Sequence, residues 1–313
     1  MVVGIHTSAR HCSFDSIVGI SDIIIRQILN SGVPIFFAIS GYFLSKKDLS
    51  TKDNRLSFWK HQIPKVYIPT LIWGIPWLLL SLYLGGNPFI QFGLWLCCGL
   101  AVFYYIAVTI QNYLLLPIYQ QITSPRRRIL ISLVISTATI MLITWLRVIK
   151  GVNLPLIVYA GFFPLWMIFF SLGVELANYK KDYKVYVLIV LVFLILAMQV
   201  VESYYLERFG GPGYGIKLSS FLFSILTILI LFSDRTQKLW CSNSVIARLF
   251  VRIGEMSFAI YLTHYLIANL IVTRLPIYHL WAIDWSLTLL FSIILVVLLQ
   301  KLLPESWHKY IGV

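Results

Sequence analysis

The segment VYVLIVLVFLILAMQVV, residues 185–201, contains no charged residue, and Gln199 is its one strongly polar side chain. A helix that crosses the hydrocarbon core of a bilayer needs about 20 mostly apolar residues, within a range of about 17–25. This segment reaches that length without interruption. It therefore predicts a transmembrane helix.

The composition extends this prediction to the whole chain. Hydrophobic residues make up 59% of the 313 residues, charged residues make up 12%, and the mean hydropathy is +0.84. A soluble domain carries about 25% charged residues. We therefore predict an all-α, polytopic transmembrane bundle. The lipid bilayer is its predicted partner. The net charge of +13 is expected to reflect basic cytoplasmic loops, and no nucleic-acid partner is predicted.

The same length criterion predicts nine complete spans and one partial span. The complete spans lie near 30–45, 66–84, 101–121, 129–146, 160–177, 185–201, 217–233, 253–272 and 285–303. Residues 1–7 form the partial span, so we expect about ten spans, the first truncated, in a single membrane-embedded domain over 1–313. Between these spans, 17–29 predicts an interfacial helix, and 88–100 predicts a re-entrant or lipid-surface segment. No internal repeat is evident.

The distribution of basic residues orients these spans. If the first span runs outward from the cytoplasm, the cytoplasmic segments hold 18 of the 25 Lys and Arg residues. Those segments are 46–65, 124–128, 178–184, 234–252 and the C-terminal end. This asymmetry follows the positive-inside rule. No cleavable signal peptide is evident, so we predict a multi-pass protein of the inner (cytoplasmic) membrane.

Ionisable residues at membrane depth are costly, so each one is a candidate functional residue. His6 ends the partial first span, and His264 lies within SFAIYLTHYL. A neutral imidazole can act as a general base near neutral pH. The alternative for each histidine is a core residue whose ring bonds a backbone carbonyl. Glu175, near the end of another span, is expected to lie at the cytoplasmic headgroups.

A basic cluster precedes the span at 66–84. Lys60, His61 and Lys65 stand at its cytoplasmic mouth, and they either anchor lipid headgroups or hold the phosphates of an anionic donor. Headgroup anchoring is the expected role of Lys46 and Lys47.

Polar residues elsewhere leave alternatives open. Gln111 either lines a cavity or bridges helices. The predicted outer loop at 202–217 has the tyrosines and glycines of a sugar-stacking surface, or it is an ordinary loop. Adjacent Cys97 and Cys98 are expected to be apolar lining. The four cysteines lack metal-ligand or redox spacing, so no metal site is predicted. The sequence also lacks Walker A and GxSxG motifs.

Four stretches together resemble the acyltransferase-3 family of integral-membrane acyltransferases. They are VVGIHTS (2–8), PIFFAISGYFLS (34–45), FWKHQIPKVYIPTLIWG (58–74) and RIGEMSFAIYLTHYLI (252–267). The resemblance covers essentially the whole chain in order and spacing. It implies about ten spans and transfer of an acyl group, usually acetyl, from cytoplasmic acyl-CoA to hydroxyls of glycans or lipid-linked sugars. Acyl-CoA is then a donor substrate, and no permanently bound cofactor is expected.

The resemblance also assigns roles to residues. His6 matches the central histidine of the family, Ser40 and Gly41 match its "SG" element, and Lys60 or His61 together with Lys65 match its basic residues. We therefore predict His6 as the catalytic residue, which acts as a general base or relays the acyl group. The predicted substrate and acyl-CoA contacts are Ser40, Arg55, Lys60, His61, Lys65, Gln111 and His264.

The chain departs from the family pattern at two points. The family has an arginine about ten residues before the histidine, and the residues before His6 cannot contain it. Lysines also replace arginines at the basic mouth, which removes a bidentate phosphate donor. We therefore expect either that the true start of the chain lies upstream of Met1, or that this is a truncated and non-catalytic member. The other alternative is a transporter or exporter of a sugar or lipid, although no charged relay and no paired broken helices support it.

Overall fold

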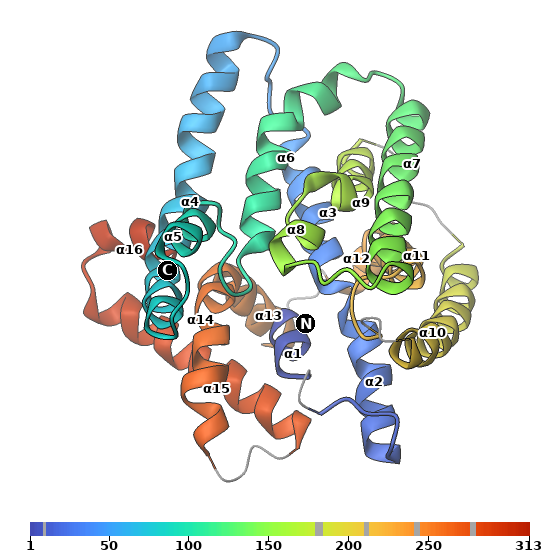
Figure 1. The fold of residues 1–313 in the computed structure, drawn as a ribbon. Helices are drawn as coiled ribbons and strands as arrows, with labels where there is room; N and C mark the ends of the chain where they lie inside the picture. The colour runs from blue at the N-terminus through green and yellow to red at the C-terminus, as the bar shows by residue number, and fades with distance from the viewer. Residues whose placement is uncertain (9–10, 179–183, 210–212, 241–244, 276–279) are drawn as a thin grey trace. The chain divides into compact units, whose positions relative to one another are not determined.

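The computed structural model describes residues 1–8, 11–178, 184–209, 213–240, 245–275 and 280–313. These residues form helices joined by short connections, with no β-strand among them (Figure 1). The helices are α1 (Val2–Thr7), α2 (Ile17–Leu29), α3 (Gly32–Leu44), α4 (Lys52–Tyr83), α5 (Pro88–Leu96), α6 (Tyr104–Gln121), α7 (Pro125–Thr144), the π-helical turn η2 (Trp145–Ile149), α8 (Leu156–Ala160), α9 (Phe163–Leu176), α10 (Val185–Arg208), α11 (Leu218–Leu231), α12 (Asp234–Trp240), α13 (Val245–Glu255), α14 (Ser257–Leu270), the 3₁₀ turn η3 (Val272–Arg274), α15 (Trp281–Leu302) and α16 (Glu305–Ile311). The all-α prediction is confirmed for this part of the chain.

Several of these helices are long and apolar enough to cross a bilayer. Within the described ranges there are six such segments, or seven if α13 and α14, bent by 71°, count as one broken span. The six are Ile17–Leu44, Lys52–Tyr83, Pro125–Ile149, Leu156–Leu176, Val185–Arg208 and Trp281–Leu302. The chain is therefore a multi-pass helical membrane protein, and the count of about ten spans stays a prediction.

The boundaries near the N-terminus differ from those expected. The predicted interfacial helix 17–29 and the predicted span 30–45 are α2 and α3, which together form one 28-residue candidate span over Ile17–Leu44. The polar stretch 46–65 is mostly helical, because α4 begins at Lys52 and continues to Tyr83. A helix of 32 residues is ~48 Å long, whereas the hydrocarbon core is ~30 Å thick. The first turns of α4 can therefore extend beyond the bilayer, as their polarity requires.

Contacts divide the chain into two compact units, each described by itself. Unit 1 comprises residues 1–48, 116–154 and 163–247, and unit 2 comprises residues 49–115, 155–162 and 248–313. The prediction of a single domain over 1–313 stays a prediction.

The centre of unit 1 is the crossing of α3 and α9, which lie side by side (Figure 1). Glycines make this close approach possible. A Cβ atom added at Gly41 would lie well under 3.0 Å from the carbonyl oxygen of Phe170, and one added at Gly173 would lie equally close to that of Ala38. Small residues allow the backbones of membrane helices to approach each other in this way. The "SG" element therefore contributes a glycine to helix packing.

A buried polar cluster ties three other elements of unit 1 together. Lys217, at the N-terminal end of α11, donates hydrogen bonds to Gln27 Oε1 (2.5 Å), Ser203 Oγ (2.9 Å) and the carbonyl oxygen of Gly213 (3.2 Å). Gln27 lies on α2 and Ser203 on α10. An ammonium group removed from water needs such partners, so this cluster fixes α2 and α10 against the start of α11.

Aromatic N–H and O–H groups join the helices of unit 2. Trp73 on α4 donates to the carbonyl oxygen of Ile311 (3.0 Å), and Trp95 on α5 donates to that of Leu71 (2.8 Å). The hydroxyl of Tyr261 on α14 donates to the carbonyl oxygen of Val102 (2.7 Å). The core beside these bonds consists of Cys98, Val102, Phe103, Ile106 and Leu262. Cys98 therefore packs as an apolar residue, while its neighbour Cys97 is exposed.

Candidate active site

His6 lies in the last turn of α1, a six-residue helix that belongs to unit 1. The residues around it on this helix, Val2, Val3, Gly4 and Thr7, are buried, and the imidazole itself is half-buried. The hydroxyl of Thr7 donates to the carbonyl oxygen of Val3 (3.2 Å), and that of Ser8 donates to the carbonyl oxygen of Ile5 (2.9 Å). Both hydroxyls that follow the histidine are therefore bonded within α1.

Arg26 on α2 holds the C-terminal end of α1. Its guanidinium Nη1 donates to the carbonyl oxygen of Ile5 and to the hydroxyl of Ser8, on the two sides of His6 in the sequence. The last carbonyls of a helix lack partners within the helix and carry a partial negative charge. A guanidinium is well suited to this position, because it presents several donors in a fixed plane.

The same arginine connects α1 to the region beyond α10. Arg26 Nε donates to Asn30 Oδ1 (3.0 Å), and Asn30 Nδ2 in turn donates to the carbonyl oxygen of Tyr214 (3.1 Å). Tyr214 donates its hydroxyl to Glu207 Oε1 (2.6 Å), at the end of α10. A continuous series of hydrogen bonds therefore leads from the turn that carries His6 to the segment predicted as the outer loop.

Cys12, between α1 and α2, is the nearest thiol in sequence to His6. Burial raises the pKa of this thiol to about 11, and the Arg26 guanidinium partly opposes the shift. The thiolate is the nucleophilic form of cysteine. At neutral pH Cys12 is therefore a neutral thiol, and the histidine is the candidate base of this region.

Ser40 lies on α3, one residue before the glycine at the crossing with α9. Its hydroxyl donates to the carbonyl oxygen of Phe36 (2.9 Å) in the preceding turn of the same helix. This bond satisfies the hydroxyl inside an apolar helix. A contact of Ser40 with substrate stays a prediction.

The predicted phosphate-binding residues lie on the first half of α4, in unit 2. Lys60, His61 and Lys65 are exposed. His61 and Lys65 are four residues apart, so they share one face of the helix, whereas Lys60 is rotated by about 100° from His61. Arg55 is engaged locally, because it donates to the carbonyl oxygens of Leu49 (2.7 Å) and Ser50 (3.0 Å). The face with His61 and Lys65 is the stronger candidate for an anionic ligand.

Gln111 and His264, also in unit 2, have structural partners. The amide of Gln111 on α6 donates to the carbonyl oxygen of Gly161 (2.7 Å), after α8, which is the helix-bridging role left open by the sequence. His264 on α14 is fully buried, and its Nδ1 donates to the carbonyl oxygen of Tyr261 (2.7 Å). That bond matches the alternative stated above, in which the histidine is a core residue whose ring bonds a backbone carbonyl. Their roles toward substrate stay predictions.

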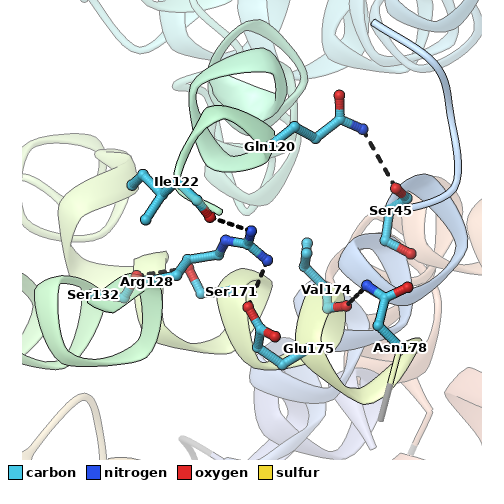
Figure 2. A network of polar contacts seen from close by, with 9 residues as sticks. All are labelled: Ser45, Gln120, Ile122, Arg128, Ser132, Ser171, Val174, Glu175 and Asn178. Carbon is cyan, nitrogen blue, oxygen red and sulfur yellow. Dashed lines mark hydrogen bonds and ion pairs between the residues drawn. The ribbon is translucent and has the colours of Figure 1, made fainter. Parts of the chain in front are cut away.

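Figure 2 shows the polar network that includes Glu175. Arg128 on α7 forms an ion pair with Glu175 on α9 (2.5 Å), and both side chains are about 90% buried. One turn further along, the hydroxyls of Ser132 and Ser171 are 2.6 Å apart. The Glu175 carboxylate is therefore buried against another helix, because Arg128 supplies the counter-charge that burial requires. Its position at the depth of the cytoplasmic headgroups stays a prediction.

Arg26 and Arg128 are the residues that sequence reasoning missed. Arg26 was part of a predicted interfacial helix, and Arg128 was one of three consecutive arginines in a cytoplasmic loop. A signal existed for Arg26, since it stands four residues before Asn30 and therefore on the same helix face. No local signal separates Arg128 from its neighbours Arg126 and Arg127, which are exposed.

The arrangement around His6 suits proton transfer. A base is most effective when its ring is fixed within hydrogen-bond reach of the proton that it accepts. α1 is too short to be a stable helix by itself, so the Arg26 bonds and the packing of its buried residues hold the histidine in place. No group of three or more His, Cys, Asp or Glu side chains suited to a metal ion occurs in the described part of the chain.

Comparison with known proteins places this arrangement in a family. Neither the curated proteins nor the solved structures compared with the chain include a match. A family model described as an acyltransferase domain matches residues 1–300, which include all of unit 1, unit 2 up to residue 300 and all of the candidate residues. The protein therefore belongs to the acyltransferase-3 family of membrane acyltransferases.

Proposed function

We propose that the protein is an O-acyltransferase of the inner membrane. It transfers an acyl group, which we propose to be acetyl, from cytoplasmic acyl-CoA to a hydroxyl group. The acceptor is a cell-surface glycan or a lipid-linked sugar. The observation that carries the proposal is the position of His6, which Arg26 holds at the end of α1 in a chain of this family. The family match favours acyl transfer over transport without covalent chemistry.

In the proposed reaction His6 acts as the general base. The neutral imidazole accepts the proton of the acceptor hydroxyl as the oxygen attacks the thioester carbonyl carbon. The new C–O bond forms, the C–S bond breaks, and the CoA thiolate takes the proton from the imidazolium. The products are the O-acyl ester and CoA–SH, and the histidine returns to its neutral form. No permanently bound cofactor takes part.

The basic face of α4 is the proposed contact for the donor. Lys65 and His61 lie on one side of this helix, with Lys60 adjacent and Arg55 five residues before Lys60. A lysine ammonium group forms charge-assisted hydrogen bonds with phosphate oxygens, although it lacks the bidentate geometry of arginine. Ser40 in unit 1, and Gln111 and His264 in unit 2, are proposed as further contacts of the substrates.

The decisive experiment measures CoA release by purified protein in lipid nanodiscs that is given radiolabelled acetyl-CoA and extracted surface glycans. We expect release that depends on added glycan, and His6→Ala should reduce it by at least about 100-fold, the lower range for a lost general base. His308→Gln, a histidine substitution in α16, is the matched control and should retain activity. Full activity of His6→Ala would overturn the proposed mechanism.

A further inference from the structure

A groove of about 240 Å³ opens between the segment after α1 and the C-terminal end of α10, within unit 1. Phe14, Asp15, Tyr204, Glu207 and Arg208 line it. Its volume equals about eight water molecules at ~30 Å³ each, which is the size range of one monosaccharide unit. The charge distribution of the chain assigns this end of α10 to the outer side, away from the basic segment 178–184.

The aromatic rings give the groove an ordered apolar wall. The rings of Phe14 and Tyr204 meet edge to face with centroids 5.3 Å apart, and Phe14 stacks on Tyr214 at 6.2 Å. The guanidinium of Arg208 lies over the ring of Tyr204, 4.5 Å from its centroid. Aromatic faces bind the C–H face of a sugar ring, because both surfaces are apolar and flat.

Polar groups lie at the edge of these rings. Glu207 accepts the hydroxyl of Tyr214 through Oε1, and Asp15 accepts that of Ser13 through Oδ2 (2.8 Å). Each carboxylate has a second oxygen that can accept bonds from vicinal hydroxyls, and the Arg208 guanidinium can donate. Burial and the neighbouring Glu207 carboxylate raise the pKa of Tyr214, so its phenol remains protonated and keeps Glu207 in place.

The groove is joined to the turn that carries His6. Tyr214 donates its hydroxyl to Glu207, and its carbonyl oxygen accepts a hydrogen bond from Asn30. Asn30 accepts a hydrogen bond from Arg26, which also donates to Ile5 and Ser8, on the two sides of His6. A ligand seated in the groove would therefore contact a framework that also fixes the catalytic histidine. Two carboxylates against one guanidinium give the lining a formal charge of −1, which disfavours anionic ligands.

From the aromatic wall, the two carboxylates of the lining and this connection to His6, we propose that the groove is the acceptor subsite and binds an uncharged, hydroxyl-rich saccharide unit. The proposal rests on the proposed function and names the part of the chain that recognises its acceptor.

The test is binding of fluorescently labelled protein in nanodiscs to an array of neutral and acidic bacterial oligosaccharides. We expect binding to neutral glycans, weakened at least about tenfold by Tyr204→Ala, which removes an aromatic surface, and by Glu207→Gln, which removes the charge from a hydrogen-bond acceptor. Tyr186→Ala, an exposed tyrosine at the other end of α10, is the matched control and should bind as the wild type does. Glu207→Gln keeps the shape of the side chain, so it tests recognition even if Tyr204→Ala unfolds.

A second measurement separates this proposal from the proposed function. Slow hydrolysis of acetyl-CoA without acceptor depends on the donor site and His6, and Tyr186→Ala, which lies outside the groove and the hydrogen bonds that join it to the turn of His6, should leave it unchanged. If the wild type does not hydrolyse acetyl-CoA, the proposed enzymatic function is contradicted. The glycan array still tests the proposed role of the groove in that case. The groove assignment is overturned if the wild type binds no glycan, if it prefers acidic ones, or if both groove variants bind unchanged.

Discussion

Arg26 is the residue whose role depends most on its partners. A lone arginine in the apolar run IVGISDIIIRQIL is typical of an interfacial helix, with the charge directed to headgroups. Its guanidinium instead donates hydrogen bonds to Ile5, Ser8 and Asn30. The side chain is therefore a positioning residue, because it acts through the end of α1 and not on the reacting atoms.

We expect Arg26→Ala to lower kcat for acyl transfer by roughly 100-fold, the cost of a misplaced catalytic group, with the KM for acyl-CoA unchanged. Hydrogen exchange of the α1 amides should become faster, since α1 loses its anchor. Arg26→Lys should recover part of the activity, because an ammonium can bond one carbonyl but cannot also reproduce the planar Nε bond to Asn30. An Arg26→Ala variant with normal kcat and normal α1 exchange would refute the positioning role.

At the scale of helices, glycine spacing and one buried ion pair hold α3, α7 and α9 together. The sequence predicts spans over most of these residues, but it does not predict which helices touch. Gly41 and Gly173 mark the α3–α9 crossing, and the Arg128–Glu175 pair with the serine pair beside it marks the α7–α9 contact (Figure 2). Removing either partner of a buried pair leaves an uncompensated charge, so both residues are needed together.

Gly173→Ala should lower the free energy of unfolding by about 1–3 kcal/mol, the range for overpacking a tight contact. The added methyl group would meet the backbone oxygen of Ala38, which cannot rotate away as a side chain could. Thermal unfolding in detergent measures the change. Gly254→Ala in α13, where nothing lies within 4 Å of the new Cβ, is the matched control and should not lower stability. Equal stability of the Gly173 and Gly254 variants would show that α3 and α9 do not cross this closely.

At the scale of the whole molecule, the proposed enzyme divides its substrates between two parts of the chain. The donor contacts are proposed on α4 in unit 2, and the histidine and groove belong to unit 1. Mutations in the two parts should therefore change different kinetic constants.

Lys65→Ala should raise the KM for acetyl-CoA by about tenfold, as expected for one lost charge-assisted bond, and leave the KM for the glycan unchanged. The effect should shrink at high salt, because ionic strength screens an exposed charge. Lys46→Ala, the predicted headgroup anchor, is the matched control and should leave both constants unchanged. If Lys65→Ala leaves the KM for acetyl-CoA unchanged at low salt, the donor contact lies elsewhere.

The sequence by itself determined the class of this protein. Long uncharged runs such as 185–201 have no stable alternative to helices in a bilayer, because every backbone group must be bonded internally. The ordered motifs around His6, Ser40 and Lys65 indicated the family, which the match over 1–300 confirms. The apolar runs are local properties of the sequence, and the family match follows from the order of the motifs along the chain.

Only the tertiary structure decided how the candidate residues are supported. The partners in these contacts are far apart in sequence: Arg26 bonds Ile5, and Arg128 bonds Glu175. The spacing to Asn30 places Arg26 on one helix face with it but does not reveal the bond to α1, and no local pattern distinguishes Arg128 from its neighbouring loop arginines. The groove likewise combines Phe14 with the end of α10. Hydrogen bonds and ion pairs between helices depend on which faces meet, and apolar runs of similar composition leave those pairings undetermined until the helices pack.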